Sequence, residues 1–439
     1  MTHRVTMTLA TLLLFFLLLS TSHATDPCSP SQSDGSDLSI FHIYGGCSTF
    51  SHSRPTSWFN TVLNMVSKDP IRLSYLSTLV SQKTSVPIAS AQQILQTSNY
   101  VLRVKLGTPG QLMYMVMDTS SDSAWAPCSG CTGCSDSVFS PVNSTSYQAL
   151  DCTTPRCLQV RGQSCSSTAG PCVFNQTYGG DSSISAFLIQ DSLTLGRDVV
   201  LGYVFGCINA ISGKSIPPQG LVGLGRGPMS LFSQTGPLYN GIFSYCLPSF
   251  KSYYFSGSLR IGPLAQPKSI RTTPLLQNPH RPSLYYVNLT GISVARKLVP
   301  APLELLSFNP TTGAGTVIDS GTVITRFVQP VYEALRDEFR SRVNGTISSL
   351  GAFDTCFDTR MNEAPPVVTL HFEWMDMVLP AENALIHSSA QPLACLAMAA
   401  APNNVNSVLN VIANFQQQNH RILFDLVNSR VGIARELCN

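Results

Sequence analysis

Two short segments of this 439-residue chain end alike, although they lie far apart. Each is an apolar run that ends in an aspartate followed by small hydroxyl residues: Met115–Ser120 and Thr316–Thr322. A carboxylate at the end of an apolar strand is costly to bury unless it is hydrogen-bonded or paired. If Asp118 and Asp319 face each other, they cannot both ionise cheaply and must share one proton. One can then act as a base and the other as an acid, which is chemistry that activates water for hydrolysis.

A second element of the repeat follows each aspartate. An apolar pair and a small residue occur at Leu221–Gly223, and again at Val411–Ala413. A small residue there lets one backbone pass close under the loop that carries the aspartate. The aspartates are 201 residues apart, so each can belong to its own lobe.

The elements that must position these residues are mainly strands. Residues 100–106 indicate a strand that ends in a Gly-Thr-Pro-Gly turn, and short strands separated by Gly, Pro and Asn continue to the C-terminus. The best helical pattern is Pro330–Val343, with an apolar face of Val331, Leu335, Phe339 and Val343. We therefore expect a mostly β protein.

Residues 25–95 differ in texture from the rest. A serine-rich stretch is followed by apolar residues at roughly helical spacing: Trp58, Val62, Met65, Val66, Leu73, Leu76 and Leu79. Between residues 51 and 87 the cations Arg54, Lys68, Arg72 and Lys83 outnumber the single acidic residue, Asp69. We predict an inhibitory pro-segment whose cations pair with the active carboxylates at neutral pH, which acid would release. The alternative is an ordinary solvated helix.

The N-terminus is typical of an export signal. Arg4 precedes the apolar run Leu9–Leu19, and small residues before position 25 offer a cleavage site. The run is shorter than the roughly 20 residues that a membrane span needs, which favours cleavage over anchoring. With 44% hydrophobic and 12% charged residues the chain is not disordered, and a net charge of +3 without a basic run argues against nucleic-acid binding.

The cysteines agree with export. There are 14, and seven lie between Cys128 and Cys172, which predicts a disulfide framework in an oxidising compartment. The run Cys128-x-x-Cys131-x-x-Cys134 could instead bind zinc, but no second suitably spaced pair accompanies it. Four triplets fit glycosylation acceptors: Asn143, Asn175, Asn288 and Asn344.

Taken together, these motifs resemble the pepsin-like aspartic proteases, in particular the plant nepenthesin-like branch. The resemblance spans residues 95 to the C-terminus and is carried by Asp118-Thr119-Ser120, Tyr178-Gly179, Gly220–Gly225, Phe243–Pro248, Asp319-Ser320-Gly321-Thr322 and Gln416–Asn419. The cysteine-rich stretch resembles that branch's insertion, and the set is similar to apoplastic members implicated in defence.

The resemblance implies a fold and a reaction. The fold would be bilobal, with a central cleft holding an extended polypeptide substrate. A water between Asp118 and Asp319 would attack the peptide carbonyl, without a metal, a cofactor or a covalent intermediate. The two carboxylates would titrate as a pair, with activity centred in acid.

The resemblance also implies supporting roles. Thr119, Ser320 and Thr322 would hydrogen-bond near the carboxylates, and Ser120 and Gly321 belong to the same loops. Tyr178 would lie on a hairpin that closes over substrate, with Gly179 in its turn and Trp125 packed behind it. Ordinary core packing is the alternative for Tyr178 and Trp125.

Two positions depart from the family pattern. Ser120 stands where glycine is usual, and would be strained if that position needed a positive φ. Ala413 stands where glycine is usual in the second lobe, and its methyl group could crowd the Asp319 loop. Both departures favour the alternative function, a pepsin-fold binding or inhibitor protein with weak or no turnover.

The sequence therefore predicts a secreted aspartic endopeptidase made as a zymogen. Its parts would be a signal peptide (1–24), a pro-segment (25–95), an N-terminal β lobe with the cysteine-rich insertion (96–280) and a C-terminal β lobe (281–439). The mature protein would be an extracellular monomer of the apoplast or cell wall, acting on polypeptides and not bound to membranes or nucleic acid.

Overall fold

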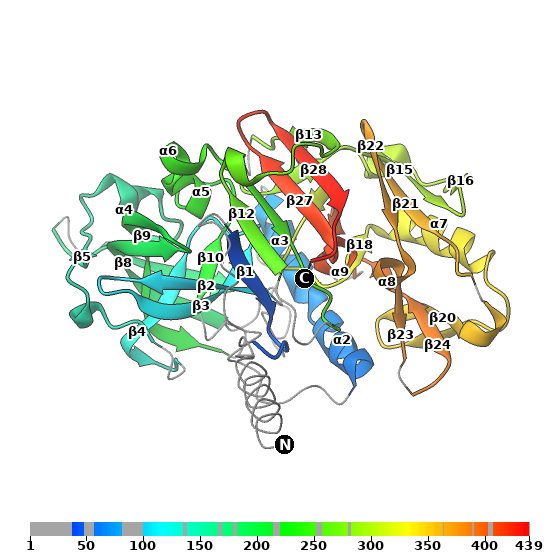
Figure 1. The fold of residues 1–439 in the computed structure, drawn as a ribbon, viewed down its shortest axis with the longest axis horizontal. Helices are drawn as coiled ribbons and strands as arrows, with labels where there is room; N and C mark the ends of the chain where they lie inside the picture. The colour runs from blue at the N-terminus through cyan, green and yellow to red at the C-terminus, as the bar shows by residue number, and fades with distance from the viewer. Residues whose placement is uncertain are drawn as a thin grey trace, which may run out of the picture.

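The computed structural model describes residues 37–47, 57–80, 100–134, 138–165, 169–178, 182–213, 220–251, 257–279, 282–362, 364–388, 390–402 and 407–438. The signal peptide, Arg54, Lys83 and Gly179 lie outside these described residues. Figure 1 shows two β-rich lobes side by side, with strands of both meeting between them. The expected mostly β, two-lobed fold is confirmed.

The first lobe is built from strands whose pairings are mostly antiparallel. Its main strands are β2 (Tyr100–Leu106), β3 (Gln111–Asp118), β4 (Trp125–Thr132), β7 (Val173–Tyr178), β8 (Ser182–Leu195), β9 (Asp198–Ser212) and β10 (Leu221–Gly223). The pairings of β3 with β10 and of β4 with β9 are parallel. Short elements on its outside are β5 (Gln148–Ala149), α4 (Pro155–Gln159), β6 (Gln163–Ser164), α5 (Leu231–Gln234) and α6 (Gly236–Tyr239). Burial along β3 rises towards its end, so that the strand delivers Asp118 into the interior.

The second lobe repeats part of this plan. Its strands are β14 (Tyr285–Val287), β15 (Leu289–Val294), β16 (Lys297–Leu298), β17 (Gly315–Ile318), β18 (Thr325–Phe327), β19 (Ser348–Leu350), β20 (Phe353–Asp358), β21 (Val368–Phe372), β22 (Met375–Leu379), β23 (Leu385–His387), β24 (Leu393–Leu396), β25 (Met398–Ala400) and β26 (Leu409–Ile412). Its helices are α7 (Gln329–Arg340), α8 (Ala381–Ala384) and α9 (Asn414–Gln417). The predicted helix is thus confirmed with earlier bounds, and Val343 lies beyond its end while still packing against the core.

A set of six antiparallel strands, part of one larger sheet, joins the two lobes. Its order by pairing is β1 (Asp37–His42), β12 (Gly257–Ile261), β11 (Ile242–Cys246), β27 (His420–Asp425), β28 (Arg430–Arg435) and β13 (Thr272–Leu276). The β11–β27 pair is the seam between the halves of the chain, and β27 is drawn in red between the two lobes in Figure 1. The lobes are therefore held in one continuous hydrogen-bonded frame.

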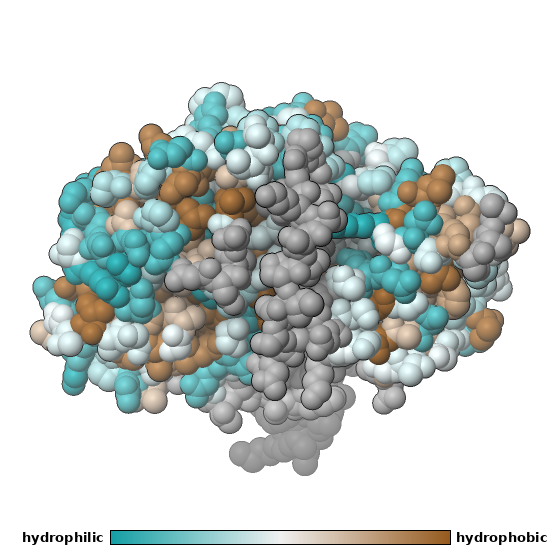
Figure 2. Space-filling model, turned by 180° about the vertical axis from the view of Figure 1, so that it is seen from behind, coloured by the Kyte–Doolittle hydropathy of each residue, from teal (hydrophilic) through white to brown (hydrophobic). Residues whose placement is uncertain are grey.

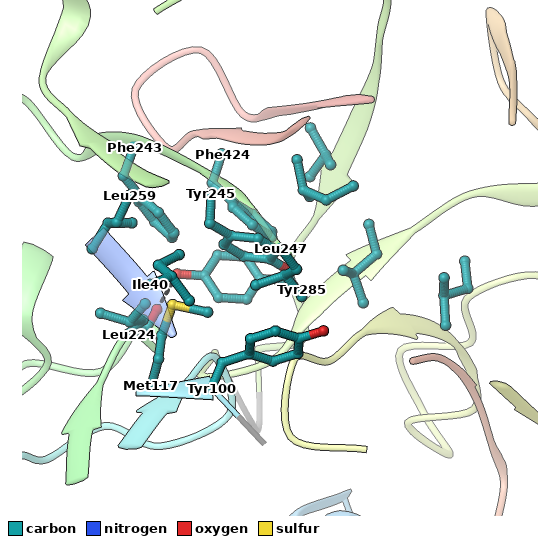
Figure 3. Packing of buried hydrophobic residues seen from close by; sticks show 14 of the residues in the cluster. Ile40, Tyr100, Met117, Leu224, Phe243, Tyr245, Leu247, Leu259, Tyr285 and Phe424 are labelled. Atoms are coloured by element: carbon teal, nitrogen blue, oxygen red, sulfur yellow. Dashed lines mark hydrogen bonds between the residues drawn. The ribbon is translucent and has the colours of Figure 1, made fainter. Parts of the chain in front are cut away.

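The core beneath this sheet mixes residues of both lobes. Figure 3 shows Phe243 of β11, Phe424 of β27 and Tyr285 of β14 packed together. Phe243 and Phe424 stack with ring centroids 4.9 Å apart, and the Tyr285 ring lies 4.3 Å from that of Phe424. Aromatic packing of this kind adds to the stabilisation from burial and fixes how the lobes face each other.

The region predicted as a pro-segment contributes a strand and two helices. Strand β1 pairs with both β12 and β2, an arrangement that the sequence did not predict. The single helical pattern is divided into α2 (Trp58–Val66) and α3 (Asp69–Val80), because Ser67 ends the first helix and Asp69-Pro70 begin the second. Both helices lie between the two lobes in Figure 1.

Disulfides are numerous in the described part of the chain. Six bridges are Cys128–Cys207, Cys131–Cys134, Cys152–Cys165, Cys157–Cys172, Cys246–Cys438 and Cys356–Cys395. Cys47 is disulfide-bonded as well. The three cysteines considered for zinc are all in bridges, so the disulfide interpretation of that run is confirmed.

The surface has no single dominant character on the face drawn in Figure 2. Outside the grey atoms, hydrophobic residues lie singly or in small groups among hydrophilic ones over both lobes. Among the described residues, none of the helices combines the length and apolar character that a membrane crossing requires.

Candidate active site

Asp118 and Asp319 stand at equivalent places in the two lobes. In the first lobe β10 runs parallel to β3 and places Gly223 beside Asp118; in the second, β26 runs parallel to β17 in the same way. The backbone N–H of Leu224 donates to the Asp118 carbonyl (2.8 Å), and that of Asp319 donates to the Ile412 carbonyl (3.0 Å). The repeat in the sequence thus corresponds to a repeat in the structure.

Reciprocal hydrogen bonds tie the two aspartate loops together across the lobes. The Ser320 N–H donates to Thr119 Oγ1 (2.9 Å), and the Thr119 N–H donates to Ser320 Oγ (3.3 Å). All four residues of this crossing, Thr119, Ser320 and their neighbours Asp118 and Asp319, are buried. The crossing fixes the distance between the lobes at the point where the carboxylates meet.

Each carboxylate is also held within its own loop. Asp118 accepts from the Ser120 N–H (2.9 Å) and from the Ser120 and Ser121 hydroxyls (3.1 Å each). Asp319 accepts from the Thr322 hydroxyl at 2.7 Å. Sequence reasoning missed Ser121, although its place three residues after the aspartate, the same as that of Thr322, could have revealed it.

A single cation from the preceding helix lies between the two carboxylates. Arg72 Nη2 donates to Asp118 Oδ1 (2.6 Å) and to Asp319 Oδ1 (2.8 Å), and also to Ser120 Oγ (2.6 Å). Its Nη1 and Nε reach the second oxygens of the two aspartates at 3.0 and 3.1 Å. Arg72 Nη2 therefore lies at a point from which a single donor reaches both carboxylates.

The loop beside Arg72 has no room for a larger residue. A Cβ atom at Gly321 would lie 2.3 Å from Arg72 Nη2. The glycine after Ser320 is therefore required for the guanidinium to seat against both aspartates. Of the four cations in the predicted pro-segment, Arg72 makes the contact, while Lys68 makes no ion pair among the described residues.

The electrostatics of the site follow from this ion pair. Burial alone would raise the pKa of Asp118, but the charge and hydrogen bonds of Arg72, with those from Ser120 and Ser121, outweigh it and hold the pKa below its ordinary value. Burial opposes the charge on Arg72, yet Asp118 and Asp319 together raise the pKa of the guanidinium well above its ordinary value. Both partners are thus stabilised in their charged forms while they remain together.

The Asp319 loop is supported from below by buried amides. Gln417 Nε2 donates to the carbonyls of Asp319 (3.2 Å) and Ile412 (2.8 Å), while its Oε1 accepts from the Tyr245 hydroxyl at 2.6 Å. Asn414 Nδ2 donates to the Ser320 carbonyl at 2.9 Å. The Gln-Gln-Gln-Asn motif of the resemblance thus connects the interlobe strand β11 to the second aspartate.

Of the hairpin predicted to close over substrate, the structure describes Tyr178 and the supporting Trp125 but not Gly179. Tyr178 ends β7, which forms a hairpin with β8, and its register partner is Ser182. Trp125 begins β4, is 1% exposed, and packs in the core cluster beneath this hairpin. This packing fits both the supporting role and the structural alternative that the sequence left open.

The two departures from the family pattern are accommodated. Ser120 is not among the residues with positive φ, so the expected strain is absent, and its hydroxyl bonds Asp118 and Arg72. Ala413 is buried, and its N–H donates to Thr325 Oγ1 at 3.2 Å. Its first-lobe counterpart Gly223 has no such space, because a Cβ there would lie 2.5 Å from the Ser123 carbonyl oxygen.

The four predicted glycosylation acceptors differ in accessibility. Asn143, Asn175 and Asn344 are exposed. Asn288 is half-buried, and its Nδ2 donates to Glu373 Oε2 at 2.9 Å. The first three asparagines are therefore better placed to carry a glycan.

Comparisons with known proteins agree with this geometry. Family models described as "Xylanase inhibitor N-terminal" and "Xylanase inhibitor C-terminal" match residues 100–263 and 284–435. The chain is 58% identical to "Aspartyl protease AED3" of Arabidopsis thaliana over 98% of its own length and 97% of that protein's. It is 34% identical to "Aspartic proteinase nepenthesin-1" of Nepenthes gracilis, covering 77% of this chain and 78% of that one.

A solved structure with similar architecture is basic 7S globulin from soybean. The two share 22% identity with a TM-score of 0.62, over 76% of this chain and 92% of the globulin. At this identity the likeness concerns the fold.

Proposed function

The chain belongs to the plant pepsin-like aspartic proteases, and from this premise we propose that it is the zymogen of a secreted aspartic endopeptidase. Asp118 and Asp319 would be the catalytic pair. Residues 25–95, which include β1, α2 and α3, would be the pro-segment that keeps it latent. Its substrates would be polypeptides.

The observation that carries this proposal is Arg72 Nη2, which lies within 2.8 Å of an oxygen of each aspartate. A water molecule in the same position would hydrogen-bond both carboxylates once α3 departs. The ionised member of the pair would take a proton from this water as it attacks the peptide carbonyl. The protonated member would polarise the carbonyl oxygen and later help to protonate the leaving nitrogen.

The conformation of the covering segment supports latency rather than self-cleavage in place. Arg72 lies in α3, whose backbone is helical over Asp69–Val80. A cleft between two β lobes takes a substrate in extended form, in which the scissile carbonyl is free of intrahelical hydrogen bonds. A helical segment held by its arginine therefore blocks the carboxylates without presenting a bond to them.

The test is proteolysis by the purified long form. We expect little cleavage of an unfolded protein at pH 7, and cleavage after acidification that coincides with loss of the N-terminal segment. A transition-state mimic of peptide hydrolysis should inhibit it, and Asp118→Asn should abolish it. A folded protein that has lost residues 25–95 and still cleaves nothing from pH 3 to 7 would overturn the proposal.

A substitution of Arg72 tests latency separately. Arg72→Gln leaves the two aspartates without their cation, so the segment should bind less tightly and the long form should show at least about ten-fold more activity at pH 6. Lys68→Gln removes a cation of the same segment that pairs with no described carboxylate, and should change nothing. Equal activity of both variants and the parent at pH 6 would remove Arg72 from the latency mechanism.

A second candidate function is suggested by the matching family models, whose descriptions name xylanase inhibitors. A protein of that type would bind a glycan-cleaving enzyme and would need no paired aspartates. The complete set of hydrogen bonds around Asp118 and Asp319 favours the protease. Tight binding to a xylanase together with no proteolysis would reverse this preference.

Export and the extracellular state belong to the same proposal. Several disulfides and the exposed acceptor asparagines Asn143, Asn175 and Asn344 support secretion and glycosylation. We expect a monomeric glycoprotein of the apoplast or cell wall that binds neither nucleic acid nor membranes.

A further inference from the structure

The helix that carries Arg72 makes a second buried ionic contact, one turn earlier. The carboxylate of Asp69, the first residue of α3, accepts from the backbone N–H groups of Val323 (2.8 Å) and Ile324 (3.1 Å). Arg326 Nη2 lies 3.5 Å from Asp69 Oδ2. Asp69 and Arg326 are 2% and 4% exposed. This contact lies outside the catalytic pair and plays no part in the mechanism above.

The groups that receive Asp69 belong to the second lobe. Val323 and Ile324 follow the Asp319 loop directly, and Arg326 lies in β18, which pairs with β25 and β26. Arg326 Nη1 is anchored by a hydrogen bond to the Ala400 carbonyl at 3.1 Å. The receptor for the carboxylate is therefore built into the sheet and does not depend on α3.

The other hydrogen bond and the ion pair of the Arg326 side chain are made with the segment itself, within the described residues. Its Nη2 donates to the Val66 carbonyl (3.2 Å), and in the described part of the chain Asp69 is the carboxylate with which it pairs. Its Nε is buried and has no hydrogen-bond partner in the part of the chain that the structure describes. If α2 and α3 left, the Arg326 guanidinium would lose the acceptors Val66 and Asp69. The N–H groups of Val323 and Ile324 would lose the Asp69 carboxylate.

We propose that the Arg326 guanidinium and the Val323 and Ile324 N–H groups form a substrate subsite that selects an acidic side chain close to the scissile bond. This proposal rests on the proposed function, because it assumes that peptides occupy the cleft once the segment has left. The segment then shows the subsite in its occupied state, with Asp69 standing for the acidic residue of a substrate.

The spacing sets where that residue should lie. Asp69 and Arg72 are three residues apart in a helix, about 4.5 Å along the axis at 1.5 Å per residue. An extended peptide advances about 3.3 Å per residue. The acidic residue should therefore lie within about one or two positions of the bond that is cut.

The surroundings of the subsite are apolar. Val323 and Ile324 belong to a buried cluster with Phe250 and Phe415, against which α2 packs through Phe59 and Val62. In these apolar surroundings, the Arg326 guanidinium and the two backbone N–H groups are the groups that could stabilise an ionised substrate side chain. Lysine or arginine at the same substrate position would face Arg326 directly and should be rejected.

The titratable groups around the subsite set the conditions of the test. Burial of the α3 N-terminus against the second lobe raises the pKa of Asp69 to about 6 despite Arg326 and the two N–H groups. Among the described residues, Tyr332 is a further titratable group that faces Arg326. A substrate carboxylate in an open cleft keeps more of its water, and a free aspartate ionises near pH 3.9. The preference should therefore be measured at pH 5 and should weaken as the pH falls below about 4.

The experiment uses acid-activated enzyme and a set of peptides that place one Asp, Asn or Lys at each position around a single cleavage site. We expect one position at which kcat/KM for Asp exceeds that for Asn by about ten-fold, and that for Lys by more. Cleavage at equal rates whichever residue is present at every position would overturn the subsite and leave the proposed function intact. No cleavage of any peptide would instead be a failure of the proposed function.

Variants assign the preference to Arg326. In Arg326→Gln the Asp-to-Asn ratio should fall to about one, and Arg326→Lys should keep part of it, because a charge remains without the guanidinium geometry. Arg360→Gln makes the same change at an exposed arginine and should keep the full ratio. If Arg326→Gln does not fold, the peptide set with the unaltered enzyme decides alone. A ratio unchanged in a folded Arg326→Gln protein would refute the assignment.

Discussion

At the residue scale, the two lobes carry different small residues at the position where a strand passes close to the aspartate loop. Gly223 passes under the first aspartate loop, where a Cβ atom would lie 2.5 Å from the Ser123 carbonyl oxygen and 2.6 Å from that of Ser121. The equivalent position in the second lobe holds Ala413, whose methyl group is fully buried. The symmetry of the fold therefore does not extend to equal space around the two carboxylates.

This asymmetry gives a paired prediction. Gly223→Ala should displace the Asp118 loop, lower the free energy of unfolding by about 2 kcal/mol or more, and remove most of the activity. Ala413→Gly should cost about 1 kcal/mol or less, through backbone entropy and the lost methyl group, and should leave activity largely intact. Denaturant unfolding and peptide kinetics on both variants check this. Similar losses in the two variants would contradict it.

The sequence predicted the aspartates but not all of their partners. Asp118 and Asp319 could be found because each repeats a local pattern. Arg72 was one of four cations with no signal to distinguish it, since its pairing depends on where a helix docks rather than on spacing. Asp69 and Arg326 gave no signal at all, because their contact joins the preceding segment to the second lobe through a tertiary arrangement.

At the element scale, the preceding segment docks in two ways. Strand β1 joins the interlobe sheet, whereas α3 lies across the aspartates and α2 packs against the cluster that contains Val323 and Ile324. The sequence indicated the helices through apolar spacing, but β1 has only six residues and follows a serine-rich stretch, so strand pairing was not predictable. The division between α2 and α3 brings Asp69 and Arg72 to their two partners on successive turns.

The strand also carries a group that responds to acid. His42 at the end of β1 is buried among the rings of Tyr44, Trp58, Tyr100 and Phe250. Its Nδ1 accepts from the Tyr44 N–H at 3.3 Å, and burial lowers its pKa to about 3. His42 is therefore neutral while β1 is docked, and it would take up a proton in acid once β1 is released.

The sign of the pH effect follows from linkage. Because the pKa of His42 is lowered in the docked state, its contribution to docking is fully present above pH 6.5 and is lost as the pH falls towards 3. Asp69 acts in the opposite sense, since its pKa is raised to about 6 and docking gains as it becomes protonated. The pKa of His42 is shifted further than that of Asp69. Of these two opposing effects the one from His42 is therefore the larger, and acidification should favour release of the segment.

A substitution separates the two groups. His42→Gln cannot become charged, so the pH at which half of the segment is released should fall by about one unit or more relative to the parent. His387→Gln makes the same change at an exposed histidine far along the chain, and should leave that pH unchanged. The measurement is the mass of the long form after incubation across pH 3 to 7. A release profile of His42→Gln identical to that of the parent would remove this histidine from the mechanism.

At the scale of the whole molecule, the interlobe sheet and the aspartate loops form one connected frame. Tyr245 of β11 belongs to the first half of the chain, and its hydroxyl donates to Gln417 of the second at 2.6 Å. Gln417 in turn donates to the carbonyl of Asp319. Thr119 and Ser320 close the frame on the cleft side. The separation of the two carboxylates is therefore set from both sides, by the sheet beneath them and by the crossing beside them.

The last prediction tests this frame by removing one hydroxyl. Tyr245→Phe keeps the ring packing against Phe424 but leaves the buried Gln417 Oε1 without a donor, which should lower the free energy of unfolding by about 1–3 kcal/mol. Because Gln417 also holds the Asp319 loop, kcat should fall more than KM rises. Tyr147→Phe, at an exposed tyrosine, should change stability by less than about 0.5 kcal/mol. A Tyr245→Phe protein that loses stability with unaltered kcat would show that the sheet stabilises the lobes without setting the geometry of the aspartates.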